Sequence, residues 1–181
     1  MTLRAMLVAA ATTLVLSCML TIPVLAGTDE SVQISDACDR VSFGQAHILC
    51  DPRAGGAVTL QQLVAAIRQN PGEVLRERDV LDWTFDQDNL AVRAGTRVTL
   101  KNVGGEFHTF TNVGSRFTLG CVPEVNALSA NLGLPPAPDC SDAVFAATGV
   151  PAQTSRVVTI TTGGKYICLI HPWMRTDVTV N

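Results

Sequence analysis

The sequence predicts an all-β fold, an antiparallel β-sandwich, preceded by an N-terminal extension that contains one helix. Two observations predict the sandwich. From about Trp83 the chain breaks into short runs in which apolar and polar residues alternate, and Gly-containing turns separate these runs. The chain has 181 residues. Once an N-terminal segment of 26 residues is removed, the remaining 155 residues have a length typical of one domain.

The chain opens with a secretory signal pattern. One charge, Arg4, precedes an apolar run over residues 5–25, and the small-residue ending at Ala26 fits a cleavage site. We expect residues 1–26 to be removed and the protein to be exported to the periplasm or the extracellular space. Two alternatives stay open. The run is about long enough to remain as a membrane anchor, and Val15–Cys18 loosely resembles a lipoprotein cleavage box.

Residues 27–82 are predicted to form an extension packed on the main domain. Residues 27–56 are rich in Gly, Asp and Ser and are expected to be mostly loop. A helix follows, because Thr59 and Gln62 match a capping box and apolar residues then recur at helical spacing. Asn70-Pro71-Gly72 ends this helix. We expect its apolar stripe to pack on the main domain.

Residues 83–181 are predicted to form the β domain. The predicted strands are Leu90–Arg93, Val98–Leu100, Phe107–Thr111, Val157–Thr161, Tyr166–Ile170 and Asp177–Val180. A long insertion rich in Pro and Ala interrupts them between residues 113 and 154. Long loops in compact domains are usually functional or tied down, and a disulfide within this one would tie it down.

The cysteines predict two disulfides and one thiol. Without the signal segment five Cys remain, and an odd count in an exported chain requires an explanation. Short loops favour the pairs Cys38–Cys50 and Cys121–Cys140, although three connectivities are open from sequence alone. Export into an oxidising compartment favours pairing over four free buried thiols. Cys168 is then the thiol that remains for a metal.

The most informative stretch lies near the C-terminus, where a thiolate, an imidazole and a thioether share one short loop. Cys168, His171 and Met174 lie between two strand-like runs. Cys and His suit a trigonal copper site, and Met suits its weak, long axial bond. Such a site needs a second His, and His108 supplies it. The sequence therefore predicts one copper ion per chain, bound by His108, Cys168, His171 and Met174.

Each of these residues also has an ordinary structural interpretation. Met usually fills a gap in a core, and a lone Cys can be a small buried hydrophobe. Scarcity favours copper, because Met174 is the only Met after the signal segment and the chain has three His. The third, His47, precedes Cys50 by three residues. We predict a surface or capping residue there rather than a ligand, because one His without a free thiol nearby makes a poor metal site.

On these residues, the region 83–181 resembles the cupredoxin family of small blue copper proteins. Cys168, two residues, His171, two residues and Met174 is the loop spacing of amicyanin-like cupredoxins. The resemblance covers about half of the chain. It implies a Greek-key cupredoxin β-sandwich, one type 1 copper and outer-sphere electron transfer.

Two strands also look like the family, and one position departs from it. Val98–Asn102 before His108 and Gly164–Tyr166 before Cys168 are similar to family members. Many members have Asn directly after the upstream His, where it hydrogen-bonds between the two ligand loops. Thr109 stands there in this chain. Its hydroxyl can serve instead, and its backbone N–H can still donate to the Cys168 sulfur.

The predicted function is one-electron transfer by an exported blue copper protein. A copper carrier or store would use the same ligands and stays open as the alternative. A metal-free adhesion module would not need all four ligand types. Enzymatic activity is not expected, because four ligands close the metal and three His are too few for a multicopper centre.

Redox partner proteins are expected to dock near His171, the ligand expected nearest to solvent. Trp173, with Leu169, Ile170 and Pro172, can form an apolar docking patch or can pack into the end of the sandwich. Nucleic-acid binding has no support, because the chain has 13 basic and 16 acidic residues and no basic run. We expect a monomer, with membrane contact only if the N-terminal segment stays uncleaved or carries lipid.

Overall fold

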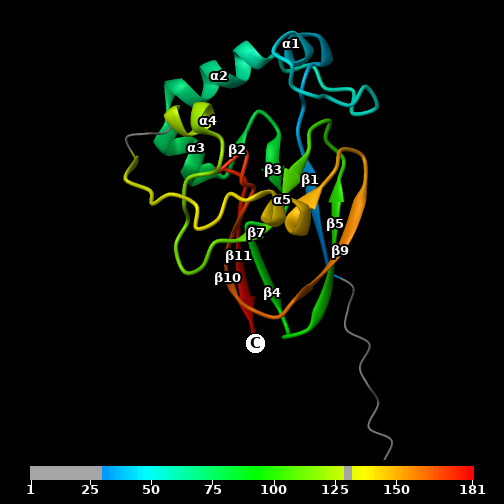
Figure 1. Ribbon diagram of the computed structural model, residues 1–181, viewed down its shortest axis with the longest axis vertical. Coiled ribbons are helices and arrows are strands. Elements are labelled where there is room, and N and C mark those ends of the chain that lie inside the picture. Colours follow the sequence, from blue (N-terminus) through cyan, green and yellow to red (C-terminus); the bar gives the residue numbers. More distant parts are fainter. Residues whose placement is uncertain (1–29, 129–131) are drawn as a thin grey trace, which may run out of the picture.

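The computed structural model describes residues 30–128 and 132–181 (Figure 1). The expected signal peptide, residues 1–26, lies outside the described residues.

The described chain forms a β-sandwich, which confirms the predicted all-β class. One sheet has the order β2 (Asp79–Val80), β3 (Trp83–Phe85), β1 (Glu30–Ser35), β5 (Thr96–Asn102), β9 (Ser155–Ile160). The other has the order β4 (Asn89–Val92), β11 (Arg175–Val180), β10 (Gly164–Ile167), β7 (Thr111–Asn112). A separate ribbon pairs β6 (His108–Thr109) with β8 (Gly149–Val150).

Alternation along the strands explains which face each sheet buries. Val98 and Leu100 in β5 are fully buried, and Leu90 and Val92 in β4 are buried with 4% and 5% of their surface exposed. The residues between them are more exposed. Side chains of a strand point to opposite faces with a period of two. The apolar faces of both sheets therefore meet in one core.

The sheets are mixed, and the purely antiparallel prediction is wrong. β1 pairs in parallel with β5, and β4 pairs in parallel with β11. Parallel neighbours require long connections, and both pairs have them. Two predicted strands are also shorter than expected. The strand predicted over Phe107–Thr111 is broken at Phe110 into β6 and β7, and the strand predicted over Tyr166–Ile170 ends at Ile167.

The N-terminal segment, residues 30–82, is more integrated than the predicted extension. β1 lies between β3 and β5, and its Val32 and Ile34 are fully buried. The prediction of a loop-rich region over residues 27–56 with one later helix missed this strand and two of the helices. Six residues of alternation between polar flanks were too weak a signal for a central strand. The segment contains three helices, α1 (Arg40–Gln45), α2 (Leu60–Gln69) and α3 (Pro71–Glu77).

The predicted helix α2 is confirmed, including its capping box. The Gln62 N–H donates to Thr59 Oγ1 (3.3 Å), and the Thr59 N–H donates to Gln62 Oε1 (2.8 Å). The helix packs Leu63 and Ile67 into the core. Asn70-Pro71-Gly72 ends α2 and also begins α3, because Pro is favoured at the first position of a helix.

The insertion also contains structure that the sequence did not predict. In its described residues, 113–128 and 132–154, it holds two short α-helices and the strand β8, and neither α-helix has a fully buried residue. The helices are α4 (Pro123–Ala127) and α5 (Asp142–Thr148). Both predicted disulfides, Cys38–Cys50 and Cys121–Cys140, are present. Cys168 is the free cysteine of the described residues, as predicted.

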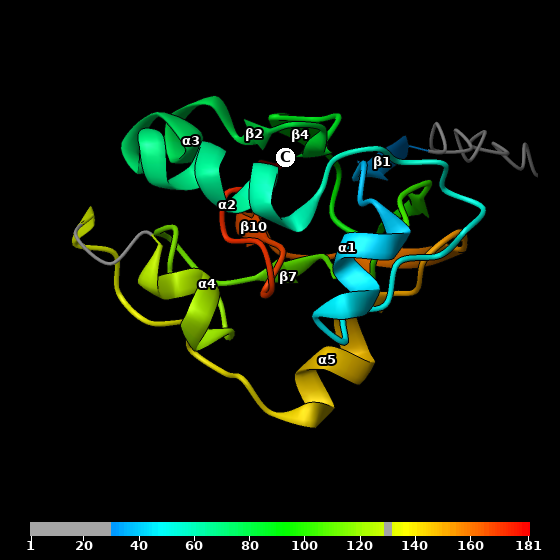
Figure 2. The same cartoon turned by 90° about the horizontal axis from the view of Figure 1, so that it is seen from above.

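The helices other than α5 gather at one end of the sandwich (Figure 1). α1, α2, α3 and α4 lie at the end opposite the C-terminus (Figure 1). Seen from that end, the red C-terminal part of the chain turns beneath them (Figure 2). Within residues 30–128 and 132–181, none of the helices is long and apolar enough to span a membrane.

Candidate metal centre

The ligand loop is the connection of a β-hairpin. β10 and β11 pair antiparallel up to Ile167 and Arg175, so residues 168–174 close the hairpin. Two backbone hydrogen bonds fix the loop, one from the Cys168 N–H to Met174 O (3.0 Å) and one from the Met174 N–H to His171 O (2.9 Å). The fourth predicted ligand, His108, begins β6 on another part of the sandwich.

Three of the four predicted ligands converge. The Cys168 Sγ lies 3.7 Å from His108 Nδ1 and 3.8 Å from His171 Nδ1, and the two Nδ1 atoms are 3.3 Å apart. A point equidistant from these three atoms would lie about 2.1 Å from each, which falls within the range of metal–nitrogen and metal–sulfur bonds. The donor set therefore fits a trigonal metal ion.

Met174 lies on the same loop with its side chain fully buried in the core that also contains Cys168. Its sulfur remains a predicted axial ligand. His47, the third His, does not belong to the cluster of potential ligands in the described part of the chain. It is exposed and has a positive φ of 60° after α1, in line with the predicted surface role.

The imidazoles stabilise the thiolate form of Cys168. Burial by itself raises the pKa of this thiol, but hydrogen bonds to His108 and His171 outweigh burial and hold the pKa well below its usual value. A thiolate is the form that binds a metal. Cys168 is thus already in its metal-binding form before a cation binds.

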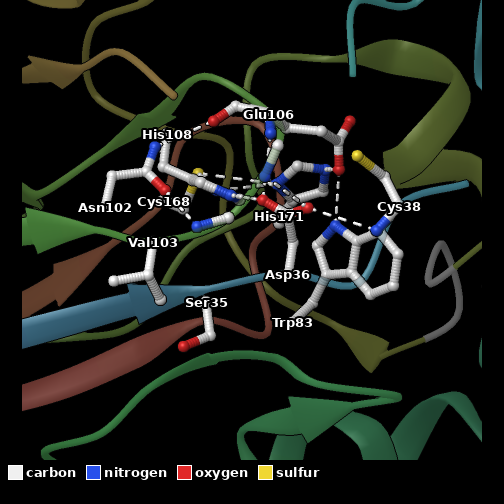
Figure 3. A network of polar contacts seen from close by, with 12 residues as sticks. Ser35, Asp36, Cys38, Trp83, Asn102, Val103, Glu106, His108, Cys168 and His171 are labelled. Atoms are coloured by element: carbon white, nitrogen blue, oxygen red, sulfur yellow. Dashed lines mark hydrogen bonds and ion pairs between the residues drawn. The ribbon is translucent and has the colours of Figure 1, made fainter. Parts of the chain in front are cut away.

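His108 has an acidic partner on the side away from Cys168. Its Nε2 lies 2.9 Å from Oδ2 of Asp36, and both side chains are fully buried (Figure 3). Burial lowers the pKa of His108, but Asp36 and the Cys168 thiolate more than compensate and raise it to about 10. Burial also raises the pKa of Asp36, and the hydrogen bond and charge of His108 outweigh it and lower that pKa to about 2.

His171 faces a second carboxyl group. Its Nε2 lies 3.6 Å from Oε2 of Glu106, and the same oxygen accepts a hydrogen bond from the Trp83 indole N–H (2.6 Å) (Figure 3). Burial raises the pKa of Glu106. Each ligand imidazole therefore has a buried carboxyl group near the nitrogen that does not face Cys168.

Thr109 connects the two ligand segments, as its position after His108 suggested. Its backbone N–H donates to the Cys168 sulfur (3.5 Å), and its Oγ1 accepts from the Leu169 N–H (2.8 Å). The hydroxyls of Thr111 and Thr148 extend this contact toward α5, with oxygen separations of 3.1 Å and 2.7 Å.

The insertion covers the ligand loop. The Cys121 N–H donates to Leu169 O (2.6 Å), and a Cβ on Gly120 would overlap that carbonyl. The Arg175 guanidinium is buried at the end of the loop and donates to Pro172 O and to Thr118 O (3.5 Å) of the insertion. The loop is held by polar contacts along its backbone as well as by its two strands.

Of the two alternatives for the apolar residues around His171, a docking patch or packing into the end of the sandwich, most of them follow the second. Leu169, Pro172 and Trp173 are buried, and Ile170 is half-buried. The Trp173 ring packs 5.4 Å from the His171 ring, so its interior packing is the alternative that holds. His171 is the most exposed of the four predicted ligands, as expected, but at only 4%.

Asp36 and Glu106 were missed by the sequence analysis. Asp36 is 72 positions from His108 and lies in a region expected to be loop, so no local spacing connects the two. The signal that did exist was weaker. Glu106 stands two residues before His108, after Gly104-Gly105, and an acidic residue beside a predicted ligand was a reasonable candidate to contact the site.

No family model and no curated protein sequence matches the chain. The similar solved structures include mutants of amicyanin. An oxidized proline-to-glycine mutant is 14% identical, with 88% of this chain and 88% of that chain covered and a TM-score of 0.37. A reduced tryptophan-to-tyrosine mutant is 20% identical, with 57% and 78% covered and a TM-score of 0.34. At these values the likeness carries no weight, and the interpretation depends on the site itself.

Proposed function

We propose that the protein is a type 1 copper protein that carries single electrons. The observation that carries this proposal is the convergence of one thiolate and two imidazole nitrogens at mutual distances of 3.3–3.8 Å. A trigonal His₂Cys set with a weak axial thioether is typical of copper electron-transfer sites.

The donor set favours copper over zinc. Structural zinc sites are usually tetrahedral and built from four Cys or His ligands. The cluster here has three such ligands, and the buried Met174 supplies the thioether sulfur that suits copper.

The chain's own part in the reaction is to hold the ligands still. Bound copper would supply the one-electron redox chemistry. His108 is fixed by β6 and Asp36, while Cys168 and His171 are fixed by the hairpin and by Thr109. Ligands that do not move on a change of charge keep the reorganisation energy low, which speeds outer-sphere electron transfer.

Titration of the metal-free protein with Cu(II) tests the site. We expect an intense visible band from charge transfer between the Cys168 sulfur and copper. Cys168→Ser is expected to abolish the band, because serine lacks the sulfur. Cys38 and Cys121 are already paired, so a disulfide variant such as Cys121→Ser with Cys140→Ser is the matched control and should keep the band. A colourless loaded protein would overturn the proposal.

A copper carrier or store with the same ligands is the second candidate. The observation that favours it is the burial of His171, which is only 4% exposed. The ring of this ligand therefore offers a redox partner little surface for direct contact. Reversible reduction in voltammetry supports electron transfer. Loss of Cu(I) to a chelator within seconds, without reversible voltammetry, supports carriage.

The remaining parts of the proposal follow from the same site. Four ligands would leave the metal no open position, so we infer no enzymatic activity.

The two disulfides support export to an oxidising compartment, periplasmic or extracellular. Redox partners are proposed to dock near His171 and Trp173. Cell fractionation and cross-linking to partner proteins test these points.

A further inference from the structure

Asp36 is a buried acidic residue that is not one of the predicted metal ligands, so the ligand set does not explain its presence. It follows β1, at the entry to the Cys38–Cys50 disulfide, and its carboxylate is fully buried. Burying a charge is costly unless every polar site on it is satisfied. Its partners should therefore reveal its role.

Four hydrogen bonds surround the Asp36 carboxylate. Oδ1 accepts from the N–H groups of Cys38 (3.2 Å) and Gly105 (2.9 Å). Oδ2 accepts from the Glu106 N–H (3.0 Å) and lies 2.9 Å from His108 Nε2. An ionised carboxylate has about four acceptor sites and no donor. The three backbone N–H groups and His108 fill those sites, so the carboxylate is ionised and His108 Nε2 is the donor.

These four hydrogen bonds of the Asp36 carboxylate fix the tautomer that His108 would have with a metal bound. With Nε2 carrying the hydrogen, Nδ1 is left to coordinate, and Nδ1 is the atom that faces Cys168 and His171. A carboxylate in this position on a ligand imidazole also raises its basicity.

The backbone around Asp36 is shaped for this contact. A Cβ on Gly104 would overlap the Asp36 carboxylate, and a Cβ on Gly105 would meet the sulfurs of the Cys38–Cys50 disulfide. Two adjacent glycines thus let the chain before His108 approach the carboxylate closely. Glu106 makes no equivalent contact, because its oxygen is 3.6 Å from His171 Nε2 and already accepts from Trp83.

We propose that Asp36 is the positioning residue of the metal site, holding His108 as the Nε2–H tautomer and biasing bound copper toward Cu(II). The inference rests on the proposed function. A negative charge one imidazole away stabilises the more positive ion, so it lowers the reduction potential. The N-terminal segment, which has no ligand of its own, thereby sets the electronic properties of the site.

Asp36→Asn tests the proposal, with Asp39→Asn as the matched control. Asp39 lies three residues away and caps α1 by accepting from the Ser42 N–H (2.8 Å), a role that Asn fills equally well. Asp36→Asn should lower the affinity for Cu(II) about 10–100-fold. If the variant loses more affinity for Cu(II) than for Cu(I), the reduction potential rises. Each tenfold difference between the two losses raises it by about 59 mV. The control should match the wild type.

Imidazole ¹⁵N NMR of the wild-type Cu(I) protein gives a second readout that needs no variant. We expect His108 to carry hydrogen on Nε2 and metal on Nδ1. A purely structural role for Asp36 would lower stability without changing the potential. The proposal is overturned if Asp36→Asn keeps the wild-type potential, or if His108 binds copper through Nε2. In either case a visible band in the wild type would leave the proposed function standing, and its absence would remove the proposed function instead.

Discussion

The N-terminal segment (residues 30–82) and the insertion (residues 113–154) are each closed by one disulfide, yet they serve the candidate metal centre in different ways. The N-terminal segment places a strand inside a sheet and delivers the Asp36 carboxylate to His108. The insertion has no fully buried residue in its described α-helices, and it meets the ligand loop through a backbone hydrogen bond to Leu169 and through partly buried apolar side chains packed around Leu169.

The difference shows what each task requires. A buried carboxylate must be held to within a fraction of an ångström, because a misplaced charge loses its hydrogen bonds and keeps its desolvation cost. A strand in the middle of a sheet provides that rigidity. Excluding water from a loop needs only contact, and short helices on a disulfide-closed segment are sufficient for it.

Removing each disulfide should separate the two roles most strongly. The bridges span 12 and 19 positions, so replacing either pair with Ser should cost about 3 kcal/mol of unfolding free energy. Loss of Cys38–Cys50 should also weaken Cu(II) binding, because Gly105 packs on that bridge and donates to Asp36. Urea unfolding of the metal-free protein and Cu(II) titration measure the two effects. The comparison fails if the Cys121–Cys140 variant loses as much Cu(II) affinity.

Two Val→Ala variants should show how differently the regions are packed. Val32 in β1 is fully buried, whereas Val144 in α5 is partly buried at the edge of a small cluster. We expect Val32→Ala to cost about 2.5 kcal/mol and Val144→Ala about 1 kcal/mol or less. Thermal or urea unfolding provides the values. Equal losses would mean that the insertion is as much a part of the core as β1.

The hydroxyl chain from Thr109 to α5 should have a smaller effect. Thr109→Val keeps the shape but leaves the buried Leu169 N–H without its acceptor, at a cost of about 2 kcal/mol. Thr148→Val, at the far end of the chain, is the control and should cost about 1 kcal/mol. If the two variants are equally destabilised, the hydroxyl of Thr109 does not support the ligand loop.

The convergence of His108, Cys168 and His171 could be predicted because its signal is local and chemical, and the role of Met174 stays a prediction. Cys168, His171 and Met174 fall within seven residues, and the strand containing His108 had the only other credible His. The disulfides followed from short loops and an odd cysteine count. The capping box at Thr59 predicted α2 because a cap is also a local interaction.

The rest depended on contacts between distant residues. β1 joins the sheet by pairing with β5, in which each partner residue lies 68 positions further along the chain, and its own six residues carry little pattern. The short helices α4 and α5 have no buried stripe to read. The burial of Trp173 and the contact of Asp36 with His108 both arise where separate segments meet, so neither is encoded in a local spacing.

X-ray absorption at the copper edge of the loaded protein tests the central claim most directly. The account predicts one sulfur and two nitrogen neighbours at short distances of about 2.0–2.3 Å, from Cys168, His108 and His171. Cys168→Ser should remove the short sulfur contribution. A first shell of oxygen and nitrogen without sulfur in the wild-type protein would contradict the account.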